Sequence, residues 1–90
     1  MNKSEFKFEI DGIGVQFPTA YRSKIETGIQ FQIKKLLGFW HSKKPHAYIL
    51  VYKRDSEGAF GFRPFEVAKV LRDGSYEMMT EEEWDQDRKK

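Results

Sequence analysis

The residues best suited to chemistry in this 90-residue chain are basic and aromatic side chains interleaved in its middle. Between Lys34 and Phe65 there are seven Lys or Arg and seven aromatic residues but only two acids, a net charge of +5. The whole chain carries +2, so the other residues sum to −3. Cations beside exposed rings are what phosphate pairing and base stacking require. This segment therefore indicates binding of single-stranded nucleic acid or of a phosphate backbone.

The candidate binding residues are cations that would contact phosphates and rings that would stack on bases. They are Phe31, Lys34, Lys35, Trp40, Lys43, Lys44, Lys53, Arg54 and Arg63. The first six form the narrowest candidate, because most other rings of the segment, Phe60 and Phe62 among them, fall in predicted strands and hence in the core. Trp and Arg are also favoured interface anchors, so a protein-interaction or inhibitor module is the close alternative.

The chain ends with the opposite charge. From Asp73 onward there are seven acids and three bases. This acidic end would repel phosphate. It could instead fold back against the basic middle, as a structural charge pairing or as a competitor for the ligand, or it could itself be a protein-binding surface.

Several catalytic and metal-binding chemistries are disfavoured by residue type. The chain has no cysteine, which excludes a cysteine nucleophile, a disulfide and a thiolate metal site. His41 and His46 are five residues apart, and no spacing of Asp or Glu around them completes a three-ligand metal site. There is no Gly-x-Ser-x-Gly or Walker motif. We therefore expect no enzyme activity, no metal and no cofactor.

A helix, strands and then Glu66 and Lys69 superficially resemble the arrangement of PD-(D/E)xK nucleases. That family needs an acid-x-Lys on a strand, so that carboxylates hold Mg²⁺ with the Lys on the same face. Glu66 and Lys69 are three residues apart and would point to opposite faces of a strand. A metal-dependent nuclease is therefore only a remote alternative.

The first twenty residues predict a β-hairpin. Apolar and polar residues alternate on both sides of Asp11-Gly12, which has the composition of a type I′ turn. A two-residue turn places three apolar pairs on one face: Ile10 with Ile13, Phe8 with Val15, and Phe6 with Phe17. Pro18 is expected to end the second strand, because it cannot donate to the ladder.

Residues 19–39 fit a helix better than a strand. Apolar residues recur at helical spacing, namely Tyr21, Ile25, Ile29, Ile33, Leu36 and Trp40. Gly38 is the expected C-cap, Gly28 would be tolerated where the helix crosses a sheet closely, and Phe31 would point outward. A strand over 29–34 explains fewer positions, but it would make the fold a small all-β barrel, which stays the alternative.

The second half predicts strands and a short helix. Residues 46–52 are apolar almost throughout, which is typical of a central strand buried on both faces. Residues 60–65 are its expected hairpin partner, with Pro64 favouring an edge position. Residues 67–71 and 76–79 around Asp73-Gly74 predict a second hairpin, which we favour over a helix from Phe65.

The C-terminal segment carries the sequence signature of a helix start. Thr80 and Glu83 have capping-box spacing, and Met79 and Trp84 have the spacing of a hydrophobic staple.

These elements predict a single α+β domain over residues 1–90, with an antiparallel sheet of about five strands, one packed helix and a short C-terminal helix. No stretch has the roughly 20 apolar residues of a membrane span. We expect a soluble, cytoplasmic protein with no membrane partner and no enzyme activity, which binds nucleic acid or a protein. Its oligomeric state does not follow from the sequence.

Overall fold

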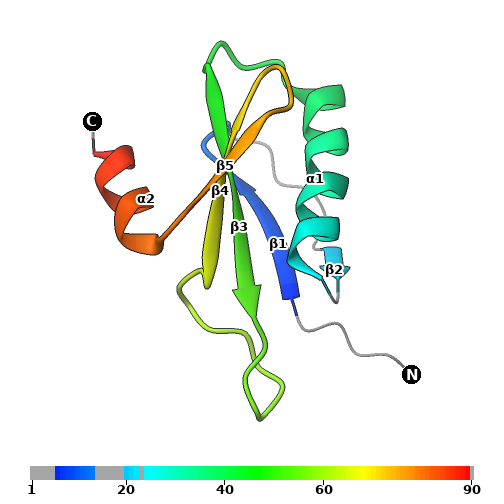
Figure 1. Ribbon diagram of the computed structural model, residues 1–90, viewed down its shortest axis with the longest axis vertical. Helices are drawn as coiled ribbons and strands as arrows, with labels where there is room; N and C mark the ends of the chain where they lie inside the picture. Colours follow the sequence, from blue (N-terminus) through cyan, green and yellow to red (C-terminus); the bar gives the residue numbers. More distant parts are fainter. Residues whose placement is uncertain (1–5, 14–19, 23, 90) are drawn as a thin grey trace.

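The computed structural model describes residues 6–13, 20–22 and 24–89, and it shows an antiparallel sheet between two helices (Figure 1). The elements are β1 (Phe6–Asp11), β2 (Ala20–Arg22), α1 (Ile25–Phe39), β3 (His46–Lys53), β4 (Glu66–Leu71), β5 (Tyr76–Met79) and α2 (Glu81–Arg88). The strand order is β2-β1-β3-β4-β5. The α+β class is confirmed. The all-β alternative is wrong, because residues 29–34 lie inside α1.

The expected count of about five strands holds only when β2 is included. Four strands have four or more residues, and the three-residue β2 adds a short edge beside β1. The two edge strands, β2 and β5, are the shortest of the sheet. Among the described residues, the central strand β3 is the longest.

The first predicted hairpin is right in its first strand and wrong in its register. β1 covers that strand, and Gly12 has a positive φ of 96°. β1 pairs with β2, however, so that Phe6 lies opposite Arg22 and Phe8 opposite Ala20. The predicted partners Val15 and Phe17 lie outside the described residues. The strand that pairs with β1 is thus further along the chain than a two-residue turn allows.

α1 is the predicted helix with corrected ends. It begins at Ile25, because residues 20–22 form β2, and it ends at Phe39 with Trp40 as its C-cap, so Gly38 is not the cap. Gly28 is buried, and a Cβ built on it would overlap the ring of Phe8 in β1. The predicted close crossing is therefore confirmed, and it outweighs a glycine cost of about 1 kcal/mol in a helix interior.

Side chains of β3 enter the core on both faces of the sheet, as predicted for a central strand. On the α1 face, Ile49 and Val51 pack in a cluster with Phe8, Ile29 and Leu36. On the α2 face lies a smaller cluster of Tyr48, Leu50, Val67 and Trp84. α1 and α2 are thus the two layers that the apolar run of β3 requires.

The predicted strand over 60–65 is wrong. β4 pairs directly with β3, from Glu66 opposite Val51 to Leu71 opposite His46. Residues 54–65 instead form a loop, in which Arg54 and Phe60 make an isolated bridge. Pro64 lacks the N–H that a ladder position needs, and β4 supplies completely buried residues such as Val67 in its place.

The C-terminal predictions are confirmed. β4 and β5 form a hairpin around residues 72–75, where Gly74 has a φ of 91°. Thr80 caps α2, and its Oγ1 accepts from the Glu83 N–H at 3.1 Å while the Glu83 carboxylate accepts from the Thr80 N–H at 3.0 Å. Met79 packs against the cluster that contains Trp84. Within the described ranges, neither helix is long and apolar enough to cross a membrane.

Candidate nucleic-acid interface

β3 divides the basic and aromatic segment between two ends of the molecule. The connector between α1 and β3, which contains Lys43 and Lys44, precedes the first residue of β3, His46. Loop 54–65 follows its last residue, Lys53. A strand of this length spans roughly 23 Å at about 3.3 Å per residue. Figure 1 shows loop 54–65 at one end of the long axis and the connector at the other. The nine candidate residues therefore do not form one surface.

Six of them lie on α1 and its connector, and we call these the helix-end group. They are Phe31, Lys34, Lys35, Trp40, Lys43 and Lys44. Phe31 is 39% exposed and Lys35 Nζ lies 4.8 Å from the centre of its ring, so its predicted outward position is confirmed. Lys34, Lys43 and Lys44 are exposed as well.

Trp40 is not a stacking surface, which corrects the sequence-based expectation. Its side chain is only 8% exposed and belongs to the core cluster under α1. The guanidinium of Arg72, from the β4–β5 turn, lies 5.0 Å from the centre of its ring. The cause is helical geometry, because residue 40 follows Leu36 by about one turn and so continues the buried face.

The other candidates lie at the opposite end, where we define the loop platform as Lys53, Arg54, Phe62, Arg63 and Phe65. Phe62 is fully exposed at 104%, and Phe65 is 50% exposed. Lys53 Nζ lies 5.1 Å from the centre of the Phe65 ring. The prediction that Phe62 fills the core is therefore wrong, since residues 60–65 do not form a strand.

Backbone contacts hold the loop platform against the sheet. The Phe65 N–H donates to the Val51 carbonyl at 2.6 Å, and the Phe65 ring stacks on Phe6 of β1 with centroids 6.3 Å apart. Asp55 closes the turn at the start of the loop, where its Oδ1 accepts from the N–H groups of Glu57 and Ala59, both at 2.9 Å. Phe65 and the start of the loop are thus fixed against the sheet.

Lys7 is a cation near this loop that sequence reasoning missed. Its Nζ lies 5.1 Å from the ring centre of Tyr52 and 5.4 Å from that of Phe60. Arg54 covers the same Phe60 ring at 5.1 Å. Lys7 contacts the Phe60 ring of the loop because it pairs across the sheet with Tyr52, a placement that only the β1–β3 register creates.

The acidic end folds back on the sheet, and one of its acids forms the expected kind of charge pair with the basic middle. Arg63 of the loop platform forms an ion pair with Glu81, the first residue of α2, although its side chain stays 81% exposed. The hydrogen bond to Glu81 is the main reason that the pKa of Arg63 lies above its ordinary value. One cation of the platform is therefore shared with α2.

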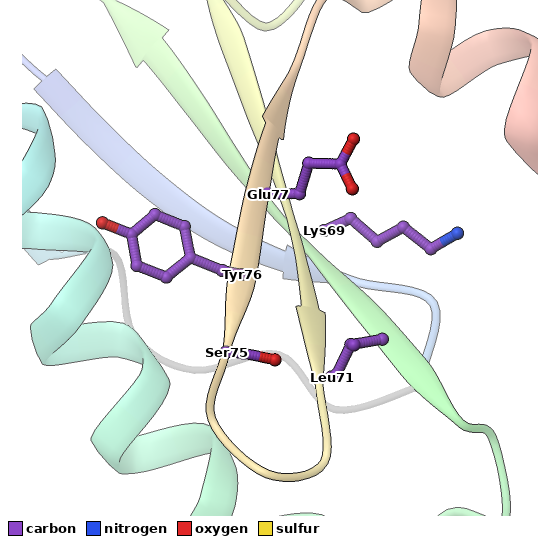
Figure 2. Close-up of a pocket in the computed structure, with 5 residues that line it drawn as sticks. All are labelled: Lys69, Leu71, Ser75, Tyr76 and Glu77. Carbon is purple, nitrogen blue, oxygen red and sulfur yellow. The ribbon is translucent and has the colours of Figure 1, made fainter.

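A shallow pocket of about 320 Å³ on the β4–β5 hairpin offers little chemistry. Figure 2 shows Lys69 and Glu77 projecting to the same side of the hairpin and Tyr76 to the other side, toward α1. Lys69 and Glu77 are directly opposed partners in the ladder, and the Lys69 ammonium forms an ion pair with Asp87 of α2. Glu66 and Lys69 lie on opposite faces of β4, so the nuclease arrangement is not formed by these residues.

The described part of the chain contains no group of three or more His, Asp or Glu residues that could hold a metal ion. Comparisons of the chain with models of known protein families, with curated proteins and with solved structures found no match. The chemistry of the site therefore has to be argued from its own residues. Exposed rings beside cations can stack on planar groups and pair with phosphates.

Proposed function

We propose that the protein is a non-enzymatic binding domain for single-stranded nucleic acid and that the loop platform is its contact surface. The observation that carries this proposal is the complete exposure of Phe62 beside Arg63 in a loop that also presents Phe65. A base stacked on an aromatic side chain gains about 1–3 kcal/mol, whatever its identity. Without a ligand, the exposed phenyl ring of Phe62 contacts only water and gains no stacking energy.

The cations around the platform support a nucleic-acid ligand. Lys53 and Arg54 adjoin the rings of Phe65 and Phe60, and Lys7 approaches from β1. A nucleic-acid strand whose bases stack on the rings would bring its phosphates within reach of these side chains. Because a flexible strand exposes its base faces, we expect single-stranded nucleic acid to bind better than a duplex.

A protein-interaction module is the second candidate, and a separate observation favours it. Exposed apolar side chains also occur away from the loop platform, namely Leu37, Phe39, Leu71 and Met78. Such residues suit a protein partner better than a nucleic acid. They lie on α1 and on the β4–β5 hairpin. One variant in the loop platform and one on this second surface therefore distinguish nucleic-acid binding from protein binding.

The test is a titration of a labelled single-stranded oligonucleotide with the wild-type protein, with Phe62→Ala and with Phe39→Ala as the matched control. Phe39 is also exposed, at 54%, but it lies at the end of α1. We expect Phe62→Ala to weaken binding about fivefold or more, since one stacking contact is lost. We expect Phe39→Ala to leave the affinity unchanged.

Salt dependence provides the second measurement. Wild-type affinity should fall steeply between about 50 and 200 mM salt, because each phosphate contact releases counterions. The proposal is wrong if no binding occurs at low salt, if binding is indifferent to salt, or if both Phe variants lose affinity equally.

A further inference from the structure

A second polar cluster lies between the start of β3 and α2, away from the loop platform. The Tyr48 hydroxyl donates to Asp87 Oδ2, and its oxygen lies 3.2 Å from His46 Nε2. Lys69 Nζ is 3.1 Å from the same Asp87 oxygen. The Tyr48 hydrogen bond and then Lys69 hold the pKa of Asp87 below its ordinary value. Asp87 is thus an ionised carboxylate whose charge is already compensated.

This cluster forms one wall of an open cleft of about 740 Å³. Lys44 contributes from the connector, Lys69 from β4 and Arg88 from α2, while Asp11 from the end of β1 is the acid besides Asp87. Three cations thus face two carboxylates, and one of the carboxylates is held by Tyr48 and Lys69. Within the lining, cations from three separate segments outnumber carboxylates by one, although Arg88 also pairs with Asp85 outside the lining.

Two of the cations, Arg88 and Lys44, differ in whether their charged groups already contact other side chains. Arg88 is held in position, because its guanidinium lies 3.9 Å from the ring centre of Trp84 and 2.9 Å from Asp85 Oδ1. Lys44 Nζ makes no ion pair with any described residue. Lys44 can therefore turn toward an incoming anion without breaking a contact of the fold.

His46 is the imidazole in the lining of the cleft. Partial burial and then the charge of Lys69 lower the pKa of its imidazole, although Asp87 acts in the opposite direction. Because the Tyr48 hydroxyl proton goes to Asp87, His46 Nε2–H is the donor to the Tyr48 oxygen. Nδ1 of the neutral ring then has no hydrogen-bond partner among the residues that the structure describes. Protonation at Nδ1 would make it a donor to an anion.

We propose that this cleft binds a phosphate group, either free or as the monoester of a nucleotide, between Lys44, Arg88 and His46. The tetrahedral oxygens accept from the ammonium and the guanidinium, and the imidazolium adds a third donor once it takes up a proton. The site does not depend on the proposed function, because the cleft and the loop platform lie at opposite ends of β3.

The test is an NMR titration of the full chain with inorganic phosphate, followed at the ring signals of the two histidines. His41 serves as an internal control, since it is exposed and does not line the cleft. We expect a saturable shift of the His46 signals, with a rise of the His46 pKa in the presence of phosphate, and no comparable change at His41. Sodium chloride at matched ionic strength should not reproduce the effect.

Neighbouring lysines give a matched pair of variants. Lys44 lines the cleft whereas Lys43, also exposed, does not. Lys44→Ala should weaken phosphate binding about tenfold, because one charge-assisted hydrogen bond is lost, and Lys43→Ala should weaken it less than about twofold. Adenosine 5′-monophosphate in place of phosphate separates the two sources, since tighter binding assigns the cleft to a nucleotide and equal binding to free phosphate.

The proposal is overturned if phosphate and chloride shift the His46 signals alike, if the shift does not saturate, or if the two lysine variants lose affinity equally. Lys44 and Lys43 are both exposed connector residues, so neither variant is expected to disturb folding. If Phe62→Ala lowers oligonucleotide affinity but leaves phosphate binding unchanged, that result concerns the loop platform and not the cleft.

Discussion

The loop platform and the helix-end group have similar residue types but present them in opposite ways. In the loop platform the ring of Phe62 is fully exposed and that of Phe65 half exposed. In the helix-end group the largest ring, Trp40, is buried under the guanidinium of Arg72, and Phe31 is the exposed ring. The same composition therefore yields exposed rings at one end of β3 and a buried tryptophan at the other.

The difference follows from the elements that carry the rings. Trp40 continues the apolar face of α1, and that face packs on β1 and β3. Phe62 lies in a loop, and none of the strands and helices in the described part of the chain covers it. The exposure of a ring thus depends on whether its position faces a packed layer, and charge in the sequence does not indicate where this occurs.

The largest expected effect tests whether the two rings have these different roles. Trp40→Ala should lower the free energy of unfolding by about 3–5 kcal/mol, because a large buried side chain leaves a cavity. Phe62→Ala should change it by less than about 0.5 kcal/mol, because that side chain is exposed. Urea denaturation of both variants measures the contrast.

Trp40→Phe is the control in case Trp40→Ala does not fold. It keeps most of the buried ring area and should lose less stability than Trp40→Ala. Equal losses of stability for Trp40→Ala and Phe62→Ala would contradict the comparison.

A smaller effect is expected from the charges at the two ends. Lys53→Ala with Arg54→Ala should reduce the salt dependence of oligonucleotide binding by about 1.4 in the log–log slope, from two phosphate contacts on a single strand. The matched pair Lys34→Ala with Lys35→Ala, on α1, should leave the slope nearly unchanged. Binding isotherms at several salt concentrations give both slopes.

Each double variant removes two positive charges, so a general effect of net charge would be the same in both. If the Lys34 and Lys35 double variant changes the slope more than the Lys53 and Arg54 double variant, the helix-end group is the interface and the loop platform is not. Thermal unfolding of both variants checks that the fold is retained.

The smallest effect concerns the ion pair between Arg63 and Glu81. Glu81→Gln should release Arg63 for phosphate and raise oligonucleotide affinity about twofold, while stability changes by less than about 1 kcal/mol, as is usual for exposed pairs. Glu82→Gln is the control, because Glu82 is exposed and makes no ion pair with the described residues. Equal gains from both variants would show that only net charge matters.

Much of the architecture could be predicted from local patterns. The first strand, the central strand and the β4–β5 hairpin follow from apolar alternation and turn composition, and the capping box of Thr80 follows from residue spacing. Gly28 was a clue to the close crossing of α1 over Phe8. These features depend on residues a few positions apart, which is the range at which a single sequence is informative.

The errors in the sheet have one kind of cause. Phe60, Phe62 and Pro64 alternate like a strand, but β3 pairs with β4 instead, because Val67, Ala68 and Val70 bury completely and Pro64 lacks a donor. The partner of β1 was misplaced for a similar reason, since turn composition at Asp11-Gly12 does not decide which later segment pairs with it. Strand pairing is a competition between distant segments, and one segment's pattern does not include its competitors.

For the candidate sites, the sequence by itself determined which side chains are present: an excess of Lys and Arg with many rings in the middle, and acids at the end. Only the tertiary structure decided which of them meet. It placed Lys7 beside Tyr52 and Phe60, paired Arg63 with Glu81, and joined His46, Tyr48, Lys69 and Asp87 in one cluster. The physical reason is that exposure and charge pairing depend on long-range packing and register, which are properties of the whole sheet.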